Sequence, residues 1–246
     1  PIGGGKDSTV SMELLSGTKN TNLLLILNPR KACLETAHVG GYEDDKILKV
    51  YRTIDPLLIR LNDEGYLNGH TPFSALLAFI SLLAASVVGY KNIVLSNESS
   101  SNESTVENSS VNHQYSKSIE FESDFREYYM KYITSDINYF SFLRPINETQ
   151  IAKLFALNEA YFNVFKSCNV GSKNDIWCGK CAKCLFTFII LSPFIPSETM
   201  IRIFGSNLFE KKELICEFEQ LIGLSETKPF ECVGTIEEVN ISLCEI

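Results

Sequence analysis

Three glycines followed by Lys-Asp-Ser, at residues 3–8, are the strongest candidate for chemistry in the sequence. An amphipathic segment, residues 9–15, follows at once, so the pattern predicts a glycine loop that opens a helix. Glycine permits close approach of the backbone, and the first turn of a helix presents unpaired N–H groups at the positive end of the helix dipole. Such a loop is suited to bind phosphate. The alternative is a glycine-rich tail that merely precedes a helix.

Lys6 would add a positive charge to this loop, Asp7 could hold Mg²⁺ against phosphate oxygens, and Ser8 could donate a hydrogen bond. The spacing excludes the Walker loop, which needs a longer gap before Gly-Lys-Ser/Thr. The run resembles instead the PP-loop of enzymes that split ATP into AMP and pyrophosphate, with Gly3 at the position of the usual serine. The predicted nucleotide-binding residues are Gly3, Gly4, Gly5, Lys6, Asp7, Ser8 and, at the end of an apolar run, Asn28.

Four of the eight cysteines lie close together in the sequence, as Cys168, Cys178, Cys181 and Cys184. The Cys-Gly-Lys-Cys knuckle directs two thiolates at one point, and the last cysteine follows one helical turn later. Four thiolates suit a structural zinc ion, whereas a four-iron cluster and a pair of disulfides are alternatives. We predict zinc in a reducing compartment, which favours a cytoplasmic protein.

A polar segment, residues 97–112, follows a predicted strand at residues 92–96. Ligands of open parallel sheets lie beyond the carboxyl ends of the strands, so we expect this segment to face the same crevice as the glycine loop. The alternative is a flexible linker. Acid–base catalysis needs titratable groups, and binding of carboxylates or a diphosphate needs cations. The predicted catalytic residues are His113, Glu98, Glu103 and Lys117, and the predicted substrate-binding residues are His70 and Arg144.

The chain has 246 residues, 45% of them hydrophobic, and a net charge of −8, which suits one or two globular domains. The acidic balance argues against non-specific binding of nucleic acid. One uncharged segment, residues 71–90, is long enough to span a membrane. Its serines and alanines, and the strand that follows it, favour a fully buried helix, so no membrane span is expected. The sequence carries no signature of the oligomeric state.

Alternating strand and helix patterns predict an α/β fold with a parallel sheet flanked by helices. Because a phosphate loop normally follows a buried strand, we expect a further strand N-terminal to this sequence. A helix at residues 148–156 should begin at Asn147 as its N-cap. Strands are predicted at residues 22–29, 49–54, 92–96 and 138–143, and another helix at residues 116–133.

We divide the chain into three regions. Residues 1–145 would form a PP-loop nucleotide-binding core, residues 146–200 a helical region with the four-cysteine metal site, and residues 201–246 C-terminal helices and a tail. The tail contains Cys232 and Cys244 without further ligands at metal-binding spacing, and we assign no chemistry to it.

Four segments taken together resemble one family. This set is similar to UDP-N-acetylmuramoyl-L-alanyl-L-glutamate epimerases and covers most of residues 1–196. The glycine loop and the cysteines alone also resemble 7-cyano-7-deazaguanine synthases, but the run Asn-His-Gln-Tyr-Ser-Lys at residues 112–117 favours the epimerases. The segments are residues 3–8, 68–72, 96–99 with 111–118, and 177–184.

The resemblance implies an ATP-dependent isomerase of peptidoglycan precursor synthesis, which inverts the terminal L-Glu of UDP-MurNAc-L-Ala-L-Glu to D-Glu. Its cofactors would be ATP, Mg²⁺ and structural zinc, and its partner would be the UDP-linked muramoyl peptide. One alternative is another ATP pyrophosphatase, either a ligase that forms an amide or a nitrile or a thiolase that modifies a base. A second alternative, from a different class, is a zinc-stabilised nucleotide-binding module without catalytic activity.

Overall fold

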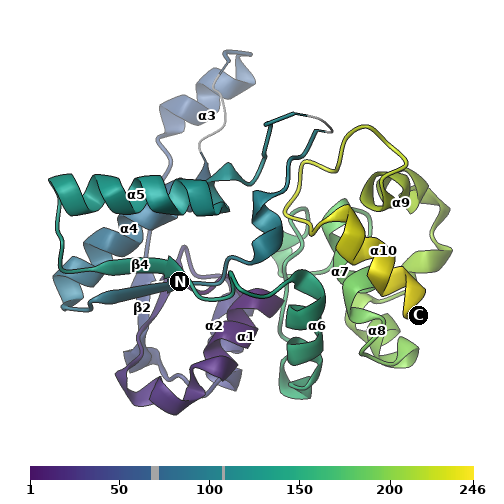
Figure 1. The fold of residues 1–246 in the computed structure, drawn as a ribbon, viewed down its shortest axis with the longest axis horizontal. Helices are drawn as coiled ribbons and strands as arrows, with labels where there is room; N and C mark the ends of the chain where they lie inside the picture. The colour runs from purple at the N-terminus through teal and green to yellow at the C-terminus, as the bar shows by residue number, and fades with distance from the viewer. Residues whose placement is uncertain (68–71, 107–108) are drawn as a thin grey trace.

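The computed structural model of the chain describes residues 1–67, 72–106 and 109–246. Within these residues, strands alternate with helices up to residue 141, and the remainder is mainly helical (Figure 1). The predicted mixed α/β class is therefore confirmed. The strands are β1 (Leu24–Leu27), β2 (Ile47–Val50), β3 (Asn92–Leu95) and β4 (Asn138–Ser141), and the α-helices are α1 (Lys6–Leu14), α2 (Lys31–Val39), α3 (Pro56–Asp63), α4 (Phe73–Val88), α5 (Ile119–Tyr132), α6 (Glu148–Ala156), α7 (Ala182–Leu191), α8 (Ser197–Phe204), α9 (Ile215–Ile222) and α10 (Ile236–Cys244).

The strands pair in parallel, as expected when helices connect them. β1 pairs with β2 through the crossover helix α2, and β3 pairs with β4 through α5. Helices α4 and α5 lie on one side of the strands, and α1 and α2 lie on the other (Figure 1). β2 ends at Val50, before the end of the strand predicted at residues 49–54, since the chain beyond it is exposed, as at Tyr51.

The two strand pairs are separate sheets in the described part of the chain. A cavity of about 330 Å³ lies between β1 and β3, with helices α1 and α4 contributing to its walls. The chain enters this space at its start, where the N–H of Ile2 donates a hydrogen bond to the carbonyl of Leu25 (2.8 Å). The space between the sheets therefore leads directly to the glycine loop.

The prediction that residues 71–90 form a fully buried helix is wrong in one respect. The helix α4 exists, but it buries one face only, with Ala78, Ser81, Leu82 and Ala85. Its opposite face is exposed, for example at Leu83 (67%) and Val87 (76%). A uniformly apolar sequence carries no periodicity that marks which face packs, so only the tertiary contacts decide it. At 16 residues, α4 is too short to cross a bilayer, and no other helix among the described residues has the length and apolar character to do so.

The C-terminal helices surround α7, which is buried along its whole length. Contacts with α6, α8, α9 and α10 cover it. Helix α6 joins this helical region to α1, and its start carries the predicted Asn147 cap: the Asn147 side chain accepts from the Gln150 N–H (2.8 Å), and the Gln150 side chain accepts from the Asn147 N–H (3.0 Å). The reciprocal cap fixes the first residue of α6, which proves important for the site.

Candidate active site

The glycine loop is packed against the start of α2. Gly4 has φ of +77°, and a Cβ there would lie 3.0 Å from the carbonyl carbon of Ala32 and from the backbone nitrogen of Cys33, so the position requires glycine. The carbonyl of Gly5 accepts hydrogen bonds from the hydroxyls of Ser8 (3.0 Å) and Thr9 (3.1 Å). In this structure the Ser8 hydroxyl bonds within its own loop, and its role as a donor to phosphate stays a prediction.

The tight fit at Gly4 leads to a prediction about stability. Gly4→Ala should destabilise the protein by about 2 kcal/mol or more, because it combines an unfavourable backbone conformation with a clash against backbone atoms. Gly3→Ala is the matched control, since a Cβ at Gly3 would meet nothing within 4 Å. Urea unfolding of both variants measures the effect, and equal midpoints for the two would contradict it.

Lys6, the first residue of α1, is buried and pairs with two carboxylates, those of Asp7 and Glu148. Burial disfavours the ammonium, but attraction to Asp7 and Glu148 outweighs it and raises the pKa of Lys6. The lysine side chain is therefore a permanent cation inside the protein. Its partner Glu148 comes from α6, so the ion pair joins the glycine loop to the helical region.

Three carboxylates converge beside this lysine. One oxygen from each of Asp7, Glu98 and Glu148 lies within 4.8 Å of the other two, and Glu98 and Glu148 are buried. Burial raises the pKa of Glu148 to about 7, and repulsion from Asp7 and Glu98 adds to it against the attraction of Lys6. Burial by itself would raise the pKa of Asp7, but attraction to Lys6 and Lys183 outweighs burial and lowers that pKa. The group has the oxygen ligands that Mg²⁺ prefers.

The raised pKa of Glu148 gives a pH dependence with a definite sign. A buried carboxyl whose pKa rises on folding contributes stability below its ordinary value of 4.5, and this contribution is lost as the pH rises through about 7. Relative to Glu148→Gln, the wild type should lose unfolding free energy between pH 5 and pH 8. Urea unfolding without nucleotide or Mg²⁺ measures this difference, with Glu64→Gln, at an exposed position, as the control. A difference that stays constant with pH would contradict the assignment.

Glu98 is held by a network that also uses Arg144. The hydroxyl of Ser100 donates to the Glu98 carboxylate (3.0 Å), while Arg144 Nη1 and the Ser101 hydroxyl each donate to the Glu98 carbonyl (2.8 Å). Arg144 Nη2 also donates to the carbonyl of Lys117. The segment after β3 is therefore ordered around the arginine, and the linker alternative is wrong for its described residues. Through these contacts, Arg144 holds this segment in place.

The remaining predicted catalytic residues contact the C-terminal segment. Lys117 Nζ donates to the side-chain carbonyl of Gln114 (3.4 Å); burial opposes its charge, but attraction to Cys232 and Glu98 raises its pKa. Glu103 pairs with Lys228, and the exposed His113 ring lies edge-to-face with Phe230, with 5.9 Å between ring centroids. Of the predicted acid–base residues, the structure places Glu98 with the carboxylates at the glycine loop and gives Lys117, Glu103 and His113 partners from the tail.

Asn28, predicted to bind nucleotide, makes a contact within the fold. Asn28 has φ of +48°, and its side-chain carbonyl accepts from the N–H of Arg52 (2.7 Å), so it holds the end of β1 to the chain beyond β2. His70 lies outside the described residues.

The prediction from sequence missed several residues that the structure places at the site. Glu148 is the first residue of α6, and Lys183 lies between two of the clustered cysteines. Lys183 Nζ donates to the carbonyl of Cys232, and its N–H donates to the Glu231 carboxylate (2.7 Å). The carboxylate of Glu238 accepts from the N–H of Glu148 (2.8 Å). The only feature of the sequence that could have indicated Glu148 is its position as an acidic residue directly after the Asn147 cap. Nothing in the sequence of the tail indicated the contacts that it makes with Lys183 and Glu148.

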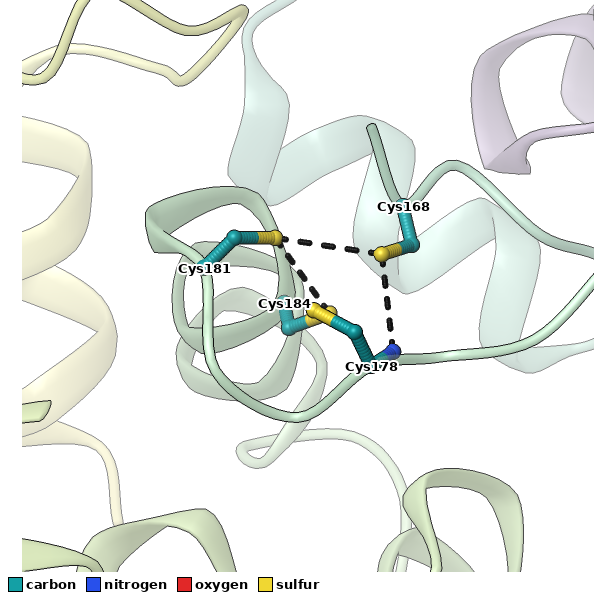
Figure 2. A group of neighbouring side chains, drawn as sticks. All are labelled: Cys168, Cys178, Cys181 and Cys184. Atoms are coloured by element: carbon teal, nitrogen blue, oxygen red, sulfur yellow. Dashed lines mark hydrogen bonds between the residues drawn. The ribbon is translucent and has the colours of Figure 1, made fainter. Parts of the chain in front are cut away.

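The four cysteines form a cluster in which the side chains point toward a common centre (Figure 2). The Sγ–Sγ distances are 3.9 Å for Cys168 and Cys181, 3.7 Å for Cys178 and Cys184, and 3.6 Å for Cys181 and Cys184. Sulfur atoms about 2.3 Å from a tetrahedral zinc ion are about 3.8 Å apart, so the donor set and its geometry fit zinc. The N–H of Gly171 donates to Cys168 Sγ (3.1 Å), which favours a thiolate. The cluster anchors the N-terminus of α7.

Parallel strand pairs, a glycine loop at a helix start and a four-cysteine cluster thus define an α/β protein with a candidate anion site and a candidate metal centre. Residues 1–142 match the MurL N-terminal domain and residues 164–246 match the MurL C-terminal domain. The chain therefore belongs to the MurL family.

Curated relatives carry the name UDP-N-acetyl-alpha-D-muramoyl-L-alanyl-L-glutamate epimerase. The relative from Salinispora tropica is 36% identical over 98% of this chain, and the match takes up 54% of its own length. The relative from a Micromonospora species is 35% identical over 98% of this chain, and the match takes up 55% of its own length. A relative from Xanthomonas oryzae pv. oryzae is 37% identical over 95% of this chain and 53% of its own. The chain spans about half the length of the relatives it matches.

Proposed function

We propose that the protein containing this chain inverts the terminal L-Glu of UDP-MurNAc-L-Ala-L-Glu to D-Glu at the expense of ATP. Membership of the MurL family and the names of the relatives support the epimerase reaction. The observation that carries the ATP requirement is the meeting of a glycine loop with Lys6, Asp7, Glu98 and Glu148 at one point. The reaction would serve peptidoglycan synthesis in the cytoplasm.

The proposed chemistry begins with the substrate carboxylate. A free carboxylate makes loss of the neighbouring α-proton difficult, because the carbanion would form beside a negative charge. Attack of the carboxylate on the α-phosphorus of ATP forms an acyl–AMP anhydride and releases pyrophosphate, which removes that charge. A base then takes the α-proton, an acid returns a proton to the opposite face, and water cleaves the anhydride to AMP and the UDP-linked dipeptide that now ends in D-Glu.

The chain offers residues for each of these tasks. The N–H groups of the glycine loop and Lys6 would bind the phosphates that leave as pyrophosphate. Asp7, Glu98 and Glu148 would hold Mg²⁺, which neutralises phosphate charge. The buried cation of Lys117, whose pKa is raised beside Glu98, is suited to stabilise developing negative charge. The cysteine cluster would hold structural zinc away from the reaction.

The decisive experiment is chiral analysis of glutamate after the full-length protein is incubated with the UDP-linked dipeptide, ATP and Mg²⁺. The proposal requires D-Glu at the substrate terminus, together with AMP and pyrophosphate. A reaction without ATP is the control. Inversion without ATP would contradict the activation step, and a new C–N or C–S bond in the product would instead indicate another kind of ATP pyrophosphatase. Binding of ATP without pyrophosphate release from the precursor would indicate a module without catalytic activity.

A further inference from the structure

The cluster loop, residues 169–177 between Cys168 and Cys178, folds tightly against the first of these cysteines. Cys168 Sγ accepts hydrogen bonds from the N–H groups of Gly171 (3.1 Å) and Cys178 (3.4 Å), the second of which is drawn in Figure 2. Within the loop, the N–H of Ile176 donates to the carbonyl of Gly171 (3.2 Å), and a Cβ at Gly171 would lie 2.3 Å from the carbonyl oxygen of Ile176. The conformation of the cluster loop therefore depends on the cysteine that precedes it.

Asp175 lies near the end of the cluster loop and caps a helix that is distant in the sequence. Its carboxylate accepts hydrogen bonds from the N–H groups of Lys31 (3.2 Å) and Ala32 (3.1 Å), the first two residues of α2. Arg30, at the N-cap position of α2, makes no capping bond with its own side chain. Asp175 has φ of +51°, a conformation that few residues with a Cβ adopt. The cluster loop therefore supplies the cap that the sequence of α2 lacks.

The glycine loop packs against the turn that Asp175 caps. A Cβ at Gly4 would lie 3.0 Å from the carbonyl carbon of Ala32, so the backbone of the loop lies directly against the backbone of α2. The Gly4 carbonyl also accepts a hydrogen bond from the N–H of Lys166 (2.8 Å), two residues before Cys168. The glycine loop is thus held by α2 and by the segment that leads into the cysteine cluster.

Arg30 makes a second connection between the cluster loop and the glycine loop. Its Nη1 donates to the carbonyl of Ser172 in the cluster loop (3.2 Å), and its Nη2 donates to the carbonyl of Gly3 (3.3 Å). Both acceptors are backbone carbonyls, so these bonds depend on the paths of the two loops and not on their side chains. A change in the path of the cluster loop would therefore reach the glycine loop through Arg30 as well as through α2.

We propose that Asp175 is a positioning residue through which the cysteine cluster sets the affinity of the glycine loop for ATP. The inference rests on the proposed function, in which the N–H groups of this loop bind the phosphates. A loop that is already ordered binds more tightly, because its order is not lost as free energy on binding. Asp175 acts through α2: its carboxylate fixes the first turn of the helix, and that turn fixes Gly4. Loss of the cluster would release the cluster loop and, with it, the cap.

Titration calorimetry of the full-length protein with ATP tests the role of Asp175. Asp175→Ala should raise the Kd for ATP about tenfold, which is in the upper part of the range for loss of one helix cap. Asp175→Asn should recover most of the affinity, because asparagine tolerates positive φ and keeps one acceptor oxygen. Asp55→Ala is the matched control, since Asp55 caps the exposed helix α3 through the N–H of Leu57 (2.8 Å). Wild-type affinity in Asp175→Ala, or equal losses in the alanine and asparagine variants, would overturn the proposal.

Hydrogen exchange tests the link to the cysteine cluster without a substitution and without nucleotide. When a chelator strips Zn²⁺ from the full-length protein, the amides of Lys31 and Ala32 should exchange at least about tenfold faster than in the zinc-loaded protein. The amides of Leu57, at the start of α3, and of Ile26, buried in β1, should keep their rates. Unchanged exchange at Lys31 and Ala32 would refute the link, and equal acceleration at Ile26 would show that the cluster supports the whole fold and not this cap.

The two experiments separate failure of this inference from failure of the proposed function. If the wild-type protein does not bind ATP, the proposed function is contradicted, whereas the exchange rates at Lys31 and Ala32 still decide whether the cluster holds the cap. If the wild type binds ATP and Asp175→Ala binds it equally well, the proposed function stands and the role of Asp175 is refuted.

Discussion

Replacing Lys6 with methionine is expected to cost about 3–5 kcal/mol of unfolding free energy, because the substitution leaves buried Glu148 without its counter-charge. The same substitution should abolish pyrophosphate release if the proposed ATP site is correct. Urea unfolding measures the first effect and a pyrophosphate assay measures the second. Lys31→Met is the matched control, since Lys31 forms an exposed pair with Glu35 that contributes less than about 1 kcal/mol.

A double substitution separates the charge effect from simple loss of packing. Lys6→Met combined with Glu148→Gln leaves no ionised partner buried in this pair, so it should recover part of the stability that the single lysine substitution loses. Activity should stay low in the double variant, because Lys6 is still absent. If the double variant is less stable than the sum of the two single effects, the pairing of Lys6 with Glu148 is not the source of the loss.

Loss of the cysteine cluster should have a second large effect. Cys181→Ser should prevent binding of the proposed zinc and lower Tm by at least roughly 10 °C, since each kcal/mol shifts Tm by about 2–4 °C in a domain of this size. Binding of structural zinc contributes about 10–16 kcal/mol in zinc-finger peptides. Here the cluster ties the loop at Cys168 to the start of the central helix α7, so the helical region should unfold first.

Metal analysis and a thermal melt check this expectation. Purified wild-type protein should carry one zinc ion per chain and show no visible absorption, and a chelator that strips the zinc should reproduce the effect of Cys181→Ser. Cys244→Ser is the control because Cys244 is exposed and belongs to no cluster among the described residues. Iron with visible absorption would replace the zinc assignment with an iron–sulfur cluster, and wild-type stability in the serine variant would rule out a structural metal.

The contacts of the tail change the view of which regions make up the site. Residues 227–238 reach it through Lys228 to Glu103, Cys232 to Lys117 and Glu238 to the Glu148 backbone. An antiparallel bridge between Val106 and Thr227 fixes the approach of this segment. The assignment of no chemistry to the tail therefore has to be replaced by a role in positioning the predicted acid–base residues.

The sequence by itself determined the features that depend on neighbours in the chain. The glycine loop, the Asn147 cap and the spacing of the cysteines each act within about one or two turns of backbone, so residue type and order are sufficient to predict them. The parallel α/β class follows in the same way from the alternation of apolar runs. The family resemblance rested on these local segments, and the matches to both MurL domains confirm it.

Only the tertiary structure decided which distant residues meet. Glu148 is 142 residues from Lys6, and Glu238 is 90 residues from Glu148, so no spacing rule connects them. The exposed face of α4 and the gap between β1 and β3 were equally invisible, because an apolar run shows that a segment packs but not what packs against it. The glycine loop is a local property of eight residues, whereas its buried charges and its position beside the gap are properties of the whole fold.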